Sequence, residues 1–347
     1  MSPTSLLAPA YAVTLGDQRW TSQALDLVVD LEAAPLVNAA RVTFPWSAPV
    51  DAAVEDAAVI ALDGGAGDGL VTVLTGVVRA VTKGLDSTTI ECVDAGALLA
   101  ALRPASTLER ATASSVIEAL CGDAGVEVGD LDTGPTLAAY VADPGRSALD
   151  HVARLAAWSG ALASVDGAGT LGTRVVDGAQ PDVALRYGRE IVSLRQRRVT
   201  TSVRSYVVAG EAGASNPAPP EASRPSSDFF AGDRPEGPGP GSRWTFEPAL
   251  RTPGSASIAA AAKLRSVTST RLRTTLDAWL LPALRPGSVV RLDDLPDGVG
   301  GVHWVERVTH HLGPAGASTT ARLAEAGPAF DPTALLSAAA GALGSAL

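Results

Sequence analysis

The sequence is poor in the residue types that most often mark catalytic, metal-binding or membrane-spanning proteins. Its 347 residues include two cysteines, four histidines and only 4% aromatic residues. Two cysteines provide neither a disulfide framework nor the ligand spacing of a zinc site, so we expect Cys92 and Cys121 to be buried thiols. No apolar run reaches the ~18 residues needed to span a bilayer, and no basic segment followed by an apolar one opens the chain. We therefore expect a protein that folds in the cytoplasm and does not insert into a membrane.

The charge balance and the turn-forming residues narrow the class further. The chain carries 27 Lys and Arg against 37 Asp and Glu, a net charge of −10. This acidic balance argues against sequence-independent nucleic-acid binding. The 24 prolines and 35 glycines favour many short strands joined by turns, and the length is sufficient for two or three domains.

Motifs that resemble catalytic or ligand-binding signatures are incomplete. Asp132-Thr133-Gly134 is the tripeptide of aspartic proteases, but there is no second copy to supply the facing carboxylate. His310 and His311 are adjacent on a predicted strand and therefore point to opposite faces, which prevents them from binding one metal. The glycine-rich residues 64–69 lack the Lys-Ser or Lys-Thr of a phosphate-binding loop. The sequence therefore predicts no enzyme, no cofactor and no metal site.

Residues 1–95 are predicted to form a first small antiparallel β-barrel. Between residues 25 and 31, three leucines and Val29 alternate with two aspartates and Val28, which is the period of a half-buried strand. The predicted strands are residues 25–31, 41–44, 59–62, 70–74, 76–81 and 88–93. The glycines at 64–69 are predicted to close a hairpin between two of them.

Residues 96–186 change to a mixed α+β pattern. Thr112 or Ser114 is a suitable N-cap for a helix that ends at Gly122 or Gly125. Residues 147–150 form a variant capping box for a second helix, which Gly160 closes. A hairpin over residues 161–176 is predicted to follow, so this segment is interpreted as an α+β insertion.

Residues 187–330 return to strands and are predicted to form a second β-barrel. Two strands are expected near residues 191–196 and 203–209, and the Pro- and Gly-rich residues 211–256 are predicted to form a loop excursion. A helix at 255–264 precedes a four-stranded meander, whose strands cover residues 270–276, 288–292, 302–311 and 318–324. Alternation in the third of these places Trp304 and Val308 on one face, with His303, Val305 and Arg307 on the other.

Three groups of residues are candidates for a subunit or partner interface. Arg195, Arg197 and Arg198 form the most basic segment, which either meets an acidic partner or is a solvated strand face. Aromatic side chains in the loop excursion are too apolar for a linker, so Phe229, Phe230 and Trp244 are expected to dock on a surface. In the C-terminal tail, residues 331–347, Leu336 and Leu343 recur at helical spacing; the tail is either a docking helix or a frayed end.

The order of these segments resembles a known family. An Ala-rich helix, a long strand, Pro286-Gly287, a short strand and then Gly300-Gly301-x-His-Trp-Val-x-x-Val-x-His are similar to the end of phage tail hub proteins. Val302, Trp304, Val305, Val308, His310 and Thr319 occupy the positions of that pattern, while Trp279 stands where many members have glycine. Residues 71–94, 107–120, 147–160 and 187–210 resemble the first barrel, the insertion and the entry to the second barrel. The family is the late-control gene D type, related to the hub half of VgrG proteins of type VI secretion.

The resemblance implies a mainly β chain with an α+β insertion and two small antiparallel β-barrels. Three copies would form a pseudo-sixfold ring that joins a hexameric inner tube to a separate trimeric spike, together with other baseplate proteins. The particle would be a contractile phage tail, a tailocin or a contractile injection system. Two other classes are a tail-associated hydrolase, which needs a catalytic constellation, and a glycan-binding β-sandwich adhesin, which needs an aromatic platform.

Overall fold

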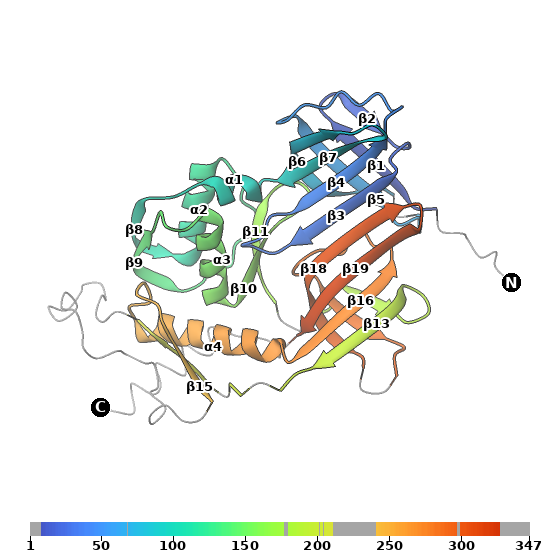
Figure 1. Ribbon diagram of the computed structural model, residues 1–347. Coiled ribbons are helices and arrows are strands. Elements are labelled where there is room, and N and C mark those ends of the chain that lie inside the picture. The colour runs from blue at the N-terminus through green and yellow to red at the C-terminus, as the bar shows by residue number, and fades with distance from the viewer. Residues whose placement is uncertain are drawn as a thin grey trace, which may run out of the picture.

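A computed structural model describes residues 8–67, 69–176, 180–200, 202–203, 205–210, 241–296 and 299–326. A large curled β-sheet forms one side of the molecule, and helices with short strands form a layer beside it (Figure 1). The prediction of a mainly β chain is therefore confirmed.

The first part of the chain builds half of the large sheet. Its strands are β1 (Ala10–Leu15), β2 (Gln18–Trp20), β3 (Asp26–Glu32), β4 (Ala39–Pro45), β5 (Ala57–Asp63), β6 (Val71–Lys83) and β7 (Ser87–Asp94). They lie in the order β3-β4-β7-β6-β5-β1-β2, and each neighbouring pair is antiparallel. In β3, Leu27, Val29 and Leu31 are buried while the intervening residues are half-buried, as their alternation predicts.

The last part of the chain builds the other half. Its strands are β12 (Val183–Arg186), β13 (Ile191–Arg198), β16 (Leu272–Trp279), β17 (Val289–Asp293), β18 (Gly301–Gly313) and β19 (Gly316–Glu325). These strands lie in the order β13-β16-β19-β18, and β17 branches from this order by pairing with the first residues of β18. The β12–β17 pair is parallel, an exception to the predicted antiparallel pairing.

The two halves are one continuous sheet because β18 also pairs with β3. The pairing is antiparallel and runs from Arg307 opposite Glu32 to Leu312 opposite Leu27. In Figure 1 these two strands lie side by side at the centre of the sheet. The division into two separate barrels and the threefold ring stay predictions.

The layer beside the sheet contains all four of the helices that lie within the described residues. Its elements are α1 (Gly96–Ala101), β8 (Ser106–Thr112), α2 (Ala113–Ala124), β9 (Thr136–Ala142), α3 (Ala148–Ser159), β10 (Ala161–Val165), β11 (Leu171–Val175), β14 (Ser205–Ala209), β15 (Ser242–Phe246) and α4 (Pro253–Ser269). It has its own core, in which Tyr140 and Trp158 are fully buried with their rings edge to face.

The ends of α2 and α3 follow from their capping residues. The Thr112 side chain accepts a hydrogen bond from the Ser115 amide, and the Ser147 side chain accepts one from the Asp150 amide. Both helices end at a glycine with left-handed backbone, Gly125 and Gly160. The observed ends of α2 and α3 therefore confirm the predicted N-caps and the predicted terminal glycines.

The predicted domain boundaries at 95/96, 186/187 and 330/331 stay predictions, but two contacts cross the second of them. Strand β12 precedes residue 187 and pairs with β17 in the large sheet. Helix α4 follows residue 187 and packs on α3 in the helical layer. The chain therefore passes between the two parts of the molecule more often than the sequence pattern indicates.

The predicted assignment of the β18 side chains to the two faces of the sheet is wrong. Val305 and Val308 are both buried, whereas Trp304 is only half-buried and Arg307 is exposed. The pairing with β19 is interrupted between Val305 and Arg307, where an extra residue on β18 shifts the alternation by one. This bulge places His303 on the buried face together with Val308.

The predicted strands 70–74 and 76–81 are a single strand, β6. Gly76 lies inside it and packs so tightly on β7 that a Cβ would overlap the Val93 carbonyl. The glycine therefore permits close approach of two backbones instead of marking a strand end.

Gly76→Ala is therefore expected to destabilise the protein by about 2 kcal/mol or more, because the backbone of β7 must move. Gly122→Ala is the matched control, because no atom lies within contact distance of its would-be Cβ and the residue is helical. It should raise the free energy of unfolding by about 0.5–1 kcal/mol. Chemical denaturation measures both, and similar effects from both substitutions would contradict the packing argument.

Candidate functional site

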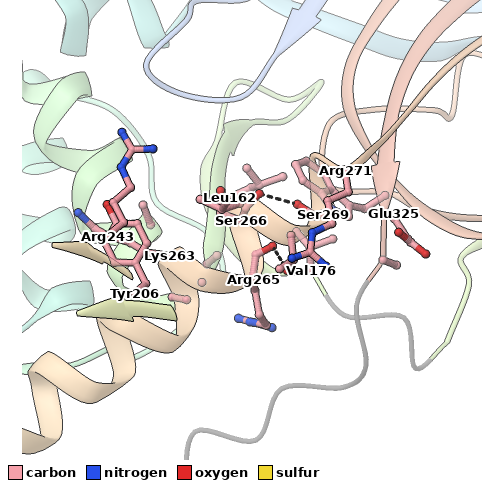
Figure 2. Close-up of a pocket in the computed structure, with 18 residues that line it drawn as sticks. Leu162, Val176, Tyr206, Arg243, Lys263, Arg265, Ser266, Ser269, Arg271 and Glu325 are labelled. Atoms are coloured by element: carbon pink, nitrogen blue, oxygen red, sulfur yellow. Dashed lines mark hydrogen bonds between the residues drawn. The ribbon is translucent and has the colours of Figure 1, made fainter. Parts of the chain in front are cut away.

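A surface cavity of about 590 Å³ lies where the helical layer meets the end of the large sheet. Its wall is formed by α4, by the junction of α3 and β10, by β14 and β15, and by residues of β18 and β19 (Figure 2). Figure 2 shows Arg243, Lys263 and Tyr206 on one side, and Arg271 with Glu325 on the other. The cavity thus brings together stretches of chain that are distant in sequence.

Local structure explains how α4 and β14 present their side chains to this cavity. Thr252 caps α4 by accepting a hydrogen bond from the Ser255 amide, which sets the start of the helix. Strands β14 and β15 pair in parallel, and the hydroxyls of Tyr206 and Thr245 are hydrogen-bonded at 2.6 Å. The Lys263 ammonium lies 5.9 Å from the centre of the Tyr206 ring, so the ring supports the cation.

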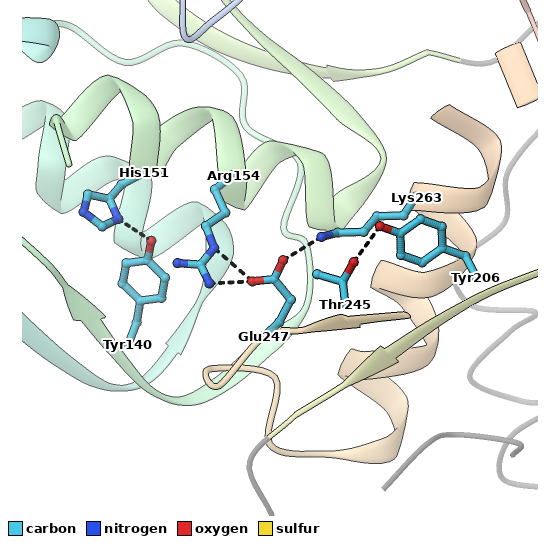
Figure 3. Close-up of polar contacts among 7 residues, drawn as sticks. All are labelled: Tyr140, His151, Arg154, Tyr206, Thr245, Glu247 and Lys263. Atoms are coloured by element: carbon cyan, nitrogen blue, oxygen red, sulfur yellow. Dashed lines mark hydrogen bonds and ion pairs between the residues drawn. The ribbon is translucent and has the colours of Figure 1, made fainter. Parts of the chain in front are cut away.

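A buried ion-pair network holds α3, α4 and the residues after β15 together (Figure 3). The Glu247 side chain is only 8% exposed and accepts hydrogen bonds from Lys263 at 2.6 Å and from Arg154 Nε at 3.1 Å, with a second, shorter one from the same guanidinium. The Arg154 guanidinium also lies 5.0 Å from the centre of the Trp158 ring. The network is structural, because each of its charged side chains is paired with another side chain of the protein.

Burial alone would raise the pKa of Glu247, but hydrogen bonds from Lys263 and Arg154 outweigh it and lower the pKa below its ordinary value. The same layer contains a buried pair in which the Tyr140 hydroxyl and His151 Nδ1 are hydrogen-bonded at 2.7 Å. Burial raises the pKa of Tyr140 to about 12, so the phenol stays neutral.

Positive charge gathers at the larger cavity. Arg243, Lys263, Arg265 and Arg271 line it, and among the described lining residues Glu325 is the one carboxylate. Of these, Lys263 is engaged by the network, and Arg271 lies 3.4 Å from the Val203 carbonyl. These side chains come from separate segments of the chain, so no local sequence pattern groups them.

A second, smaller cavity of about 260 Å³ shares Arg271 with the first. Arg197, Val199, Thr270 and Arg273 complete its described lining, which contains no carboxylate. Arg197 and Arg273 are directly opposite each other in the β13–β16 pairing, an unfavourable placement for two like charges. The alternation of Arg271, Leu272 and Arg273 was the available sequence signal for this cluster.

The predicted interface residues are only partly brought together. Arg195, Arg197 and Arg198 are all exposed on β13, and Arg197 lines the smaller cavity. Trp244 is 41% exposed on β15, which belongs to a separate two-stranded sheet. Four others lie outside the described residues: Phe229, Phe230, Leu336 and Leu343. An interface role for all of these stays a prediction.

The outer face of the large sheet carries a polar ladder that crosses five strands. The Asp277 carboxylate accepts from Ser193 at 2.7 Å and from Thr320 at 2.9 Å. Asp30 accepts from Thr309 at 2.6 Å, and Thr309 is opposite Thr320 in the sheet. Hydrogen-bonded side chains therefore cover this face on both sides of the β3–β18 joint.

His310 and His311 lie on opposite faces of β18 as predicted, and His303 lies on the buried face with His310. His310 is fully buried and hydrogen-bonded through Nδ1 to Thr319 at 2.9 Å, whereas His311 is partly exposed and lies 2.7 Å from Asp26. Burial lowers the pKa of His310 to about 4 and also lowers the pKa of His303. These buried imidazoles are neutral parts of the sheet interior.

The structure also locates Asp132-Thr133-Gly134 and the two cysteines. Gly134 of Asp132-Thr133-Gly134 has a left-handed backbone, and burial raises the pKa of Asp132. Cys92 and Cys121 are buried free thiols as predicted, with pKa values raised by burial to about 12 and about 11. Within the described parts of the chain, no three His, Cys, Asp or Glu side chains are grouped for a metal, and no helix is long and apolar enough to cross a membrane.

No family model matches the sequence, and neither does any curated protein. Solved structures do match. The tail protein from Neisseria meningitidis MC58 superposes with a TM-score of 0.69 at 15% identity, over 91% of this chain and 96% of that one. The 43 kDa tail protein of prophage MuSo2 from Shewanella oneidensis gives 0.66 at 14% identity, over 92% and 98%.

A third match is the E. coli c3393 protein, described as a component of the type VI secretion system with structural similarity to the T4 bacteriophage tail proteins gp27 and gp5. Its TM-score is 0.61 at 12% identity, over 92% of this chain and 77% of that one. At such identities the likeness establishes the fold. The chain has the fold of these tail proteins, which confirms the resemblance drawn from its sequence.

Glu247→Gln should lower the free energy of unfolding by about 2 kcal/mol at neutral pH, because two half-buried cations lose the buried carboxylate that pairs with them. The native pKa of Glu247 lies below its ordinary 4.5, so its contribution is complete above that value and is lost as the pH falls through the native pKa. Denaturant titrations of both proteins at neutral and acidic pH measure this difference.

The exposed Glu127→Gln is the matched control and should change stability little at either pH. An equal loss from the two variants, or a Glu247→Gln deficit that grows in acid, would contradict the assignment.

Proposed function

We propose that this chain is the structural hub of a baseplate, three copies of which form a ring between a hexameric inner tube and a trimeric spike. The particle is a contractile phage tail, a tailocin or a contractile injection system, in which other baseplate proteins surround the ring. The observation that carries the proposal is the tail-protein fold, which covers 91% of this chain and 96% of the Neisseria tail protein. The continuous sheet formed through β3 and β18 supports it independently.

The sheet suits a symmetry adaptor. One chain contains two sheet halves that stand side by side, so three chains around an axis would present six. The outermost strands of the sheet order, β13 at one end and β2 at the other, belong to different halves. Closing a ring head to tail would bring such edges next to those of a neighbour and protect them from wrong pairing.

We propose a structural role in place of a catalytic one. The matched solved structures are described as tail proteins or as a type VI secretion component, and the charged groups in the described lining of the two cavities are cations apart from Glu325. A tail-associated peptidase or murein hydrolase, and a glycan-binding adhesin, are the alternatives that the experiment below separates from the hub.

Light scattering or native mass spectrometry of the purified full chain should give three times the chain mass of 35.1 kDa. Co-expression with the neighbouring reading frames of its own genome should yield a complex that also contains a small trimeric spike protein. Electron microscopy of the assembled particle should place three copies on the central axis.

A stable monomer that binds glycan arrays would support the adhesin, and release of peptides or sugars from murein would support the hydrolase. A position away from the axis, or a copy number other than three, would overturn the hub.

A further inference from the structure

The charged residues that line two adjoining cavities of this acidic protein are mainly cations. We use the name basic groove for the two adjoining cavities and the cations that line them: Arg197, Arg243, Lys263, Arg265, Arg271 and Arg273. One carboxylate, Glu325, accompanies them in the described lining. The whole chain has a net charge of −10, so this local reversal of sign needs an explanation.

The arrangement is costly for the chain alone. Arg197 and Arg273 face each other across two strands, and like charges directly opposite destabilise a sheet. Arg273 lies within electrostatic reach of Glu306, whose pKa burial nevertheless raises above its ordinary value. No ion pair holds Arg197 or Arg243 within the described residues, so these positive charges remain available to a partner.

The groove is also apolar between its cations. Leu162, Val176 and Trp304 line the larger cavity and are half-buried, so each leaves part of an apolar side chain facing the cavity. A volume of about 590 Å³ falls within the range of sites that enclose a small ligand or a few residues of a peptide. A ligand that fits both features has carboxylates for the rim and apolar side chains for the wall.

From this combination we infer that the basic groove is a docking site for an acidic peptide segment with apolar side chains, contributed by a partner protein. Electrostatic attraction to Arg197, Arg243 and Arg271 favours association of the segment. Burial of its apolar side chains against Leu162 and Trp304 then stabilises the complex.

A nucleic acid fits the groove less well. The apolar wall offers nothing to a phosphate backbone, and the ring of Tyr206 is already covered by Lys263, with its hydroxyl bonded to Thr245. Base stacking, which usually accompanies basic grooves for single strands, therefore lacks the Tyr206 ring, and Trp304 is the one other aromatic side chain in the described lining.

The test uses the full chain and a fluorescein-labelled synthetic peptide of alternating Glu and Leu, with fluorescence anisotropy as the readout. Arg243→Glu and Arg271→Glu should each weaken binding by about tenfold. Arg79→Glu, an exposed arginine on β6 far from the groove in sequence and sheet position, is the matched control and should bind as the parent does. Ser266→Trp fills the cavity from the exposed side of α4 without changing charge and should also weaken binding.

Three matched probes complete the design. A Gln-Leu peptide lacks the charge, a Glu-Ser peptide lacks the apolar side chains, and both should bind at least about tenfold more weakly. A labelled oligothymidylate should bind more weakly than the Glu-Leu peptide. The inference is overturned if the Glu-Leu peptide does not bind, if the Gln-Leu peptide or the oligothymidylate binds as tightly, or if Arg79→Glu has the same effect as the groove variants.

This inference does not depend on the hub assignment, and the two fail separately. If the chain is a trimer that does not bind the Glu-Leu peptide, the docking site is contradicted and the hub assignment is not. If the chain is a monomer that binds the peptide, the hub assignment is contradicted and the docking site is not. Thermal melting of each variant checks that loss of binding does not come from unfolding.

Discussion

The pairing of β3 with β18 is the constraint on which the rest of the molecule depends. It joins residues almost 280 positions apart, with Asp30 accepting from Thr309 and pairing with Arg307 at 3.1 Å. Arg307 reaches Glu32 at 3.0 Å as well, so one guanidinium ties two acidic residues of β3 to β18. Without this joint each half of the sheet would expose an unpaired strand, an edge that proteins normally protect. The start and the end of the chain are therefore interdependent.

A second joint attaches the helical layer to the sheet. Asn38, next to β4, donates to the Asp94 carboxylate at 2.7 Å and to the Val165 carbonyl at 3.1 Å, linking the sheet to the β10–β11 hairpin. Asp94 also accepts from the Gly96 amide at the start of α1. Burial raises the pKa of Asp94 to about 6 although these hydrogen bonds oppose it.

The two buried carboxyls therefore respond to pH in opposite ways. For Asp94 the native pKa lies above the ordinary 3.8, so its favourable contribution is complete below that value and is lost as the pH rises through about 6. For Glu247 the native pKa is lowered, so its contribution is lost in acid. The attachment of the helical layer to the sheet and the attachment of α4 to α3 thus weaken at opposite ends of the acidic range.

How much of this could be predicted from the sequence depends on how local the cause is. The caps of α2 and α3 lie within three residues of the groups they bind, so Thr112, Ser147 and Gly160 predicted their helix ends. The bulge between Val305 and Arg307 is a single extra residue, and alternation alone does not locate it. The pairing of β3 with β18 leaves no periodic trace at all, because alternation predicts a strand and not its neighbour.

The basic groove could not be predicted from the sequence for the same reason, because the cause of its assembly is not local. Its cations come from β13, β15, α4 and β16, and no one of these segments is unusually basic except β13. The pairing of β13 with β16 and the packing of α4 on α3, where Glu247 lies between Arg154 and Lys263, bring them to one surface. A chain that held these charges together for stability alone would place carboxylates among them, as it does at Glu247. At Arg197 and Arg273 it places two arginines face to face instead, which is favourable once a negative partner lies between them.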